Sequence, residues 1–193
     1  MLSIPPVDRL AGNAGAAYAV FTSRPPYWAV ALFVALLAAA AAYDLKKRVI
    51  PDILSALIAL VGLSLRLINF DPYPLSLSAH EFLLALLGGI TGGGVLLLVA
   101  LIGAKILRAP AMGGGDIKLM AACCTWLSLP CVALCLLLSA LLGGLVAGVM
   151  MIARKATLKS ELPFGVMIAA GAALSFSFGE AVINWYFRLL YFL

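Results

Sequence analysis

Long apolar runs, separated by short polar or charged stretches, dominate the chain from residue 27 onward. The first three runs cover residues 27–43, 53–70 and 82–104, and the only charge within them is Arg66. Each run is close to the roughly 20 residues that a helix needs to cross the hydrocarbon core of a bilayer. The pattern therefore predicts three transmembrane helices in this part of the chain.

Two more apolar segments follow, at residues 119–153 and 162–187, and Glu180 is the only charge in the second. As a single helix the first would be about 52 Å long at 1.5 Å per residue, too long for one crossing. Pro130 lies within it, and proline removes a backbone donor and clashes with the preceding turn. We expect a break there and a hairpin of two rather short helices. The chain is thus predicted to be an all-α, polytopic membrane protein with about six transmembrane helices.

The composition supports this fold class. Hydrophobic residues make up 65% of the 193 residues and charged residues only 11%, against roughly 45–50% and about 25% in soluble domains. These values exclude a soluble globular fold and intrinsic disorder. The net charge is +5, but the basic residues do not form a stripe with interleaved aromatic residues. We therefore expect membrane lipid, and no nucleic acid, as a partner.

Basic residues are distributed unevenly between alternate connections, which predicts the orientation. Nine of the 13 lie after the first, third and fifth predicted helices: Lys46, Lys47, Arg48, Lys105, Arg108, Lys118, Arg154, Lys155 and Lys159. Connections rich in Lys and Arg stay in the cytoplasm, so both termini are expected outside. Residues 1–26 would form an extracytoplasmic segment without a cleavable signal peptide, and residues 27–193 would form the membrane domain.

Neither the cysteines nor the histidine of the chain predicts a metal site. Cys123, Cys124, Cys131 and Cys135 share one apolar run without a CxxC pair, and nothing near His80 completes a set of ligands. We expect buried thiols, no metal ion and no cofactor. The glycines of the third and fifth predicted helices indicate close helix packing instead; they are Gly88, Gly89, Gly92, Gly93, Gly94, Gly143, Gly144 and Gly148.

Two of the eight acidic residues have no obvious structural explanation. Asp52 follows Pro51 and suits the first turn of a helix, and Glu180 can pair with Arg188 near the outer surface. By contrast, Asp44 ends the first apolar run, and Asp116 follows three glycines at the start of the fourth helix. The predicted topology places both at the cytoplasmic boundary, where a carboxylate beside hydrocarbon is costly and usually functional.

Two aspartates at a partly apolar site can share one proton, one acting as base toward a water molecule and the other as acid. Peptide hydrolysis needs this pair, and Gly113, Gly114 and Gly115 would leave room for a substrate backbone. The alternative is structural: Asp44 would pair with Lys47 or Arg48, and Asp116 would cap a helix with Lys118 nearby. Residue types and spacing alone leave both interpretations open.

Three segments resemble motifs of the type IV prepilin peptidases. AMGGGDIKLMAA (residues 111–122) is similar to the family's GxGD motif, and DLKKRVIPDIL (44–54) to the segment with its first aspartate. LPFGVMIAAG (162–171) resembles the Pro-aromatic-Gly signature that opens the last helix. The resemblance extends from Tyr27 nearly to the end of the chain, and Asp52 stands where the family often has Asn.

The resemblance implies an aspartic endopeptidase of the bacterial inner membrane that removes a short basic leader from prepilins at the cytoplasmic face. Asp44 and Asp116 match its two catalytic positions. We expect the glycines beside Asp116, together with Pro163 and Gly165, to contact the substrate. The chain resembles the short form of the family, which lacks the CxxC-containing N-terminal domain. This form serves Flp-type tight-adherence pili, and we expect no methylation activity.

Two other functions fit an apolar chain with acids at helix ends. A small ion- or proton-coupled transporter should carry acids at the bilayer midplane or an inverted repeat of broken helices, and neither is evident. A noncatalytic pilus assembly factor would keep the fold but would not need both aspartates.

Overall fold

The computed structural model describes residues 27–47, 49–67, 75–108, 112–153 and 164–191. These residues form six helices and no strand: α2 (Tyr27–Lys47), α3 (Asp52–Leu67), α4 (Leu75–Leu107), α5 (Gly114–Cys124), α6 (Leu129–Ile152) and α7 (Phe164–Tyr191). Within these ranges the predicted apolar segments are helical apart from the turn at residues 125–128, which confirms the all-α fold class. The predicted extracytoplasmic segment, residues 1–26, lies outside the described residues.

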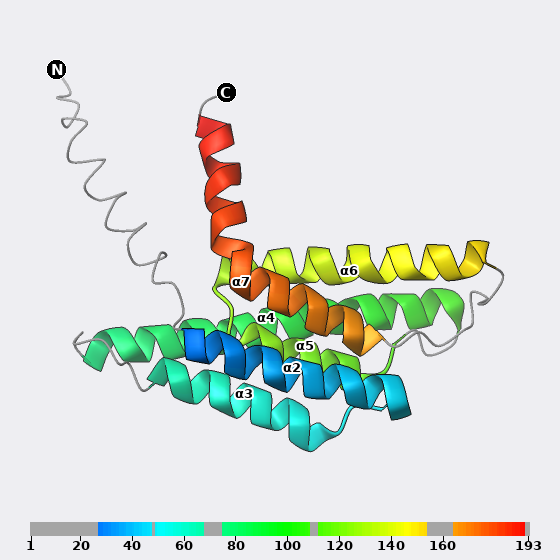
Figure 1. Ribbon diagram of the computed structural model, residues 1–193, viewed down its shortest axis with the longest axis horizontal. Helices are drawn as coiled ribbons and strands as arrows, with labels where there is room; N and C mark the ends of the chain where they lie inside the picture. Colours follow the sequence, from blue (N-terminus) through cyan, green and yellow to red (C-terminus); the bar gives the residue numbers. More distant parts are fainter. Residues whose placement is uncertain (1–26, 48, 68–74, 109–111, 154–163, 192–193) are drawn as a thin grey trace.

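The helices run alternately in opposite directions along one bundle, and the final part of α7 bends away from it (Figure 1). One end of the bundle therefore holds the α2–α3, α4–α5 and α6–α7 connections. We call this the basic end, because nine of the 13 basic residues lie in or beside these connections. Asp44 and Asp116 both belong to this end, as the charge pattern predicts.

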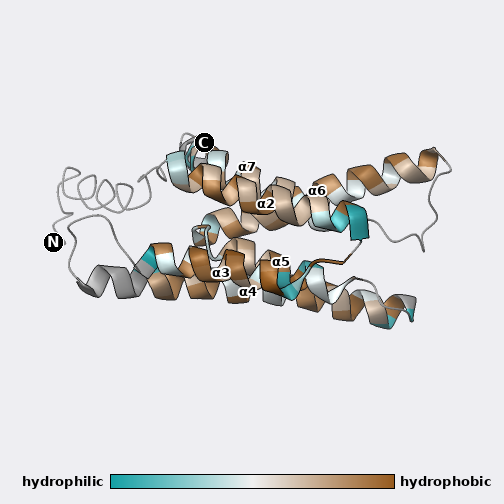
Figure 2. Cartoon of the chain, turned by 60° about the horizontal axis from the view of Figure 1, so that its bottom comes forward, coloured by the Kyte–Doolittle hydropathy of each residue, from teal (hydrophilic) through white to brown (hydrophobic). Residues whose placement is uncertain are grey.

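Four of the helices are long and apolar enough to cross a membrane: Tyr27–Lys47, Glu81–Ile106, Leu129–Ile152 and Phe164–Tyr186. Their outer faces are largely apolar (Figure 2), and side chains such as Leu98 and Ile102 of α4 and Leu145 of α6 are exposed. Lipid, not water, suits this surface. The chain is a polytopic helical membrane protein.

α5 is much shorter than the other helices, with 11 residues, and it lies inside the bundle against α3, α4 and α7. Leu119, Met120 and Cys123 on this helix are fully buried. The expected break at Pro130 is wrong in position: the chain turns at residues 125–128, and Pro130 lies in the first turn of α6. Proline is favoured there because an N–H group in the first helical turn has no intrahelical partner, so its absence costs no hydrogen bond. Only α5 is short, since α6 has 24 residues.

Aromatic rings join several helices at the centre of the core. The ring of Phe33 on α2 stacks on Trp126 at a centroid distance of 4.6 Å and meets Phe176 of α7 edge-on at 4.9 Å. Trp126 donates a hydrogen bond from Nε1 to the carbonyl oxygen of Ile58 on α3, at 2.9 Å. Burial of the indole is favourable because its single polar group has this partner.

Four glycines of α4 allow α5 to approach closely. A Cβ atom at Gly88 would lie 2.7 Å from the carbonyl oxygen of Cys124, and one at Gly93 would lie 2.8 Å from Cβ of Ala121. A Cβ atom at Gly89 would lie 3.1 Å from the carbonyl oxygen of Ala121, and one at Gly92 would overlap Sγ of Cys124. On α6, a Cβ atom at Gly143 would lie 2.7 Å from the ring of Phe164 of α7, so the packing prediction is confirmed for these five. It is wrong for Gly94, Gly144 and Gly148, which have no such neighbour within 4 Å. The four cysteines are free and buried, as predicted.

Candidate active site

Asp44 is the last member of the buried stripe of α2. The stripe consists of Ala29, Phe33, Leu37, Ala40 and Asp44, spaced three or four residues apart, so helical periodicity turns the carboxylate toward the bundle interior. Asp44 is only 4% exposed, and its Oδ2 atom has no hydrogen-bond partner among the described residues. A buried carboxylate oxygen without a partner is costly unless a ligand or proton satisfies it.

Asp116 lies in the first turn of α5, after a glycine run that begins that helix. Gly113 is the N-cap, and the carboxylate of Asp116 is favoured near the positive end of the helix dipole. Burial, and after it the negative charge of Asp44, raises the pKa of Asp116 to about 6, although a hydrogen bond with the backbone of Gly113 acts in the opposite direction. The two predicted aspartates are thus electrostatically coupled.

Ile50, in the connection before α3, belongs to one motif segment and lies against the other two. A Cβ atom at Gly115 of α5 would lie 3.3 Å from Cβ of Ile50, and one at Gly165 of α7 would lie 2.7 Å from its Cδ1 atom. A Cβ atom at Gly165 would also lie 2.8 Å from Oδ2 of Asp44. Sequence reasoning did not single out Ile50, and the Ile-Pro pair within the quoted motif was the only signal that could have done so.

The structure places the predicted substrate-contacting glycines in two different environments. Gly113 and Gly114 are exposed, and nothing lies within 4 Å of a Cβ atom at Gly114. Gly165 is buried against Asp44, and Gly115 packs on Ile50. Pro163 lies outside the described residues. Only the first two glycines are therefore open to a peptide in this structure.

Asp52 is separate from the aspartate pair. It lies in the first turn of α3, as predicted, and Lys118 donates to its carboxylate at 2.7 Å. The side chains of Asp52 and Lys118 are 70% and 57% exposed. Exposed ion pairs of this kind contribute little to stability, about 0–1 kcal/mol. Lys118 therefore pairs with Asp52 and not with Asp116.

The alternative structural role for Asp44 is not supported among the described residues. Lys47 donates to the hydroxyl oxygen of Tyr43 at 3.2 Å, with its ammonium group 5.0 Å from the centroid of the same ring. Neither of the two ion pairs in the described part of the chain includes Asp44. Arg48, the other predicted partner, lies outside the described residues.

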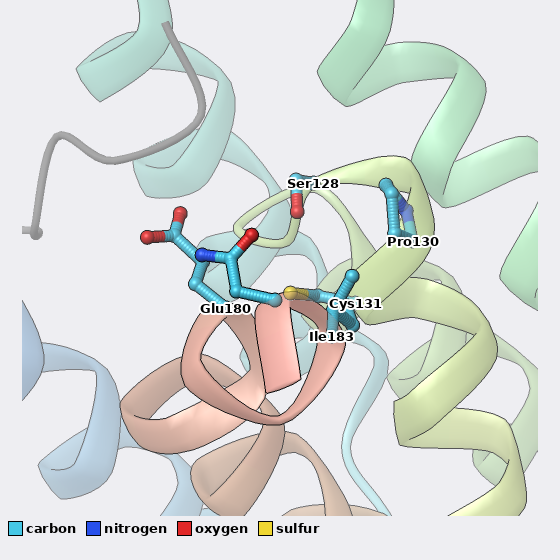
Figure 3. Close-up of a pocket in the computed structure, with 6 residues that line it drawn as sticks. Ser128, Pro130, Cys131, Glu180 and Ile183 are labelled. Atoms are coloured by element: carbon cyan, nitrogen blue, oxygen red, sulfur yellow. The ribbon is translucent and has the colours of Figure 1, made fainter. Parts of the chain in front are cut away.

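Glu180 lies far along α7 from Gly165, near the opposite end of the bundle. Figure 3 shows it beside Ser128, Cys131 and Ile183 around a small cavity. The cavity has a volume of about 20 Å³, enough for about one water molecule. The side chain of Arg188, its predicted partner, is not among those described, so that prediction stays open.

Two coupled aspartates, from different helices, lie at one end of this helical membrane bundle. This arrangement is that of a membrane protein with a paired-carboxylate site. A model of the type IV leader peptidase family matches residues 31–148, a region that includes both Asp44 and Asp116. The chain belongs to the type IV leader peptidase family.

Three curated relatives share the name prepilin leader peptidase/N-methyltransferase. The protein of Bacillus subtilis (strain 168) is 29% identical, over 82% of this chain and 58% of its own length. That of Aeromonas hydrophila is 27% identical, over 87% and 56%, and that of Xanthomonas campestris pv. campestris is 28% identical, over 79% and 50%. The chain thus spans about half the length of these relatives. No solved structure matches it.

The packing of Gly165 leads to a testable expectation. Gly165→Ala should lower the kcat of any reaction that depends on Asp44 roughly 10- to 100-fold, because the new methyl group would push the Asp44 carboxylate aside. Gly144→Ala on α6 is the matched control, since its new Cβ has no neighbour within 4 Å. Both kcat and the thermal midpoint in detergent should be measured. Full activity of Gly165→Ala would show that the contact does not position Asp44.

Proposed function

We propose that the chain is a membrane-embedded aspartic endopeptidase that removes the leader from prepilins, with Asp44 and Asp116 as its catalytic pair. The observation that carries this proposal is the coupling of two carboxylates that come from separate helices to the same end of the bundle. Membership of the leader peptidase family and the names of the curated relatives support the same reaction.

The electrostatics suggest how the two carboxylates divide the work. Below its raised pKa of about 6, Asp116 carries the proton and acts as the acid, while the unpartnered Oδ2 of Asp44 accepts a proton from water. The water oxygen then bonds to the scissile carbonyl carbon as Asp116 protonates the carbonyl oxygen. When the C–N bond breaks, the leaving nitrogen takes the proton held by Asp44, and the hydroxyl proton of the intermediate returns to Asp116.

The substrate and orientation follow from the position of the site. We propose that the basic end faces the cytoplasm of a bacterium, that the protein lies in the inner membrane, and that both termini are outside. A prepilin would leave its basic leader in the cytoplasm and its apolar helix in the bilayer, so the cut would fall at the interface. Gly113 and Gly114 are open to the peptide there. The Flp-type pilus remains the proposed system.

The pair mechanism predicts the effect of removing either charge. Asp44→Asn or Asp116→Asn should abolish leader removal while the protein still inserts and folds, because asparagine is nearly isosteric but cannot ionise. Asp52→Asn is the matched control: its exposed ion pair should cost less than about 1 kcal/mol, and most of kcat should remain. Cleavage of a prepilin in detergent would be followed by gel shift. Normal processing by either of the first two variants would eliminate this mechanism.

The raised pKa of Asp116 predicts the pH dependence of cleavage. Its protonated form is the required acid and is depleted as the pH rises through about 6. The value of kcat/KM should therefore fall above that pH, approaching a tenfold loss per pH unit. Asp52→Asn should show the same profile. A kcat/KM that is constant or rises between pH 6 and 8 would contradict the assignment of the proton to Asp116.

The proposed orientation can be tested by labelling. Cysteines introduced at Ala109 and Ala156 should react with a membrane-impermeant thiol reagent only after the inner membrane is opened, whereas one at Tyr73 should react from outside. The native thiols are buried, so the unsubstituted protein is the unlabelled control. Labelling of Ala109→Cys from outside would place the GGGD segment on the wrong side for a cytoplasmic leader.

A further inference from the structure

A groove of about 530 Å³ lies between α3 and α4 and is floored by α5. Small residues from all three helices line it: Ala59 of α3, Gly89 of α4 and Ala122 of α5. A Cβ atom at Gly89 would lie 3.1 Å from the carbonyl oxygen of Ala121, so α4 touches the backbone of α5. The exposed side chain of Ile90 stands at the rim. Small residues on adjoining helices are the surfaces on which another helix packs in lipid.

Ser55 supplies a second observation that points to a ligand. This residue lines the groove, is only 4% exposed, and its Oγ atom has no hydrogen-bond partner among the described residues. A buried hydroxyl without a partner costs roughly 1–3 kcal/mol, and an incoming polar group of a bound segment would remove that cost.

The charges of the groove lie at one end only. Asp52 and Lys118 form an exposed ion pair where the groove reaches the basic end, and the remainder of the lining is apolar apart from two hydroxyl residues. This order suits a segment that is apolar along its length and positively charged just beyond it, because a cationic side chain can take the place of Lys118 at the Asp52 carboxylate. A prepilin has that order: a basic leader, then an apolar helix.

The groove and the aspartate pair lie on opposite sides of the start of α5. Lys118 lines the groove and Asp116 faces Asp44, and two residues along a helix are separated by about 200°. Gly113 and Gly114 precede both residues at the start of α5 and are exposed. An extended peptide that crosses the start of α5 would meet no side chain at these two residues.

Resting on the proposed function, we infer that the groove between α3 and α4 binds the apolar helix of the prepilin, and that the residues before this helix cross Gly113 and Gly114 to reach the aspartate pair. The groove then selects substrates by their transmembrane helix, while Asp44 and Asp116 act on the bond just before it. Binding and cleavage thus occupy different sides of α5.

Filling the groove tests this assignment. Ala59→Trp should raise KM for a prepilin at least tenfold with little change in kcat, because binding is blocked but the carboxylates are untouched. Leu60→Trp, at an adjacent α3 residue that is 64% exposed and does not line the groove, is the control and should leave both constants unchanged. An unchanged KM in a folded Ala59→Trp protein would overturn the inference and leave the proposed function intact. Failure of the unsubstituted protein to cleave any prepilin would instead refute the proposed function.

Cross-linking provides a second test that does not depend on filling the groove. A photoreactive benzophenone amino acid at Ala56, on the groove side of α3, should form an adduct with the prepilin helix in the Asp116→Asn background, where the substrate stays intact. The same amino acid at Leu57, an exposed α3 residue that does not line the groove, should not. Mass spectrometry would identify the attached molecule. Adducts at residue 56 with lipid alone, or equal prepilin adducts at both positions, would contradict substrate binding in the groove.

Discussion

The close packing of α7 against α2 at Gly165 is the contact on which the arrangement of the site depends. A Cβ atom at this residue would crowd both Oδ2 of Asp44 and Cδ1 of Ile50, so glycine lets the first turn of α7 lie closely against the end of α2. This cover keeps Asp44 out of solvent and without a hydrogen-bond partner. Burial, and after it the negative charge of Asp44, raises the pKa of Asp116. The packing at Gly165 thus affects the protonation of the aspartate pair.

Hydrophobic patterning predicted the helices well because lipid requires long, uncharged, internally hydrogen-bonded segments. It predicted less about how they pack. Pro130 is compatible either with a break or with a first helical turn, and the sequence does not distinguish these. Gly92 and Gly94 both suit close packing by residue type, yet only Gly92 faces α5. The side of a helix that meets a neighbour depends on contacts between segments distant in sequence, which a nearly uniform apolar run does not encode locally.

The candidate site shows the same division between local and distant information. Charge bias and apolar run lengths were sufficient to assign Asp44 and Asp116 to one end of the bundle. They did not indicate that Asp44 is buried without a partner, or that Asp52 pairs with Lys118 and stays apart. Ser55 could not have been found from the sequence, because a serine in an apolar chain is unremarkable until its neighbours are known, and only the Ile-Pro pair of its motif marked Ile50. Their importance comes from contacts with α5, α7 and the groove.

The central claim, that Asp44 and Asp116 form one coupled pair, can be tested by infrared spectroscopy of the protonated carboxyl group as a function of pH. We expect a carboxylic acid band that titrates near pH 6, disappears in Asp116→Asn, and titrates at lower pH in Asp44→Asn, because burial still raises the pKa of Asp116 there but the charge of Asp44 no longer adds to it. A band with the same midpoint in Asp44→Asn as in the unsubstituted protein would show that the two carboxylates act independently and would contradict the paired site.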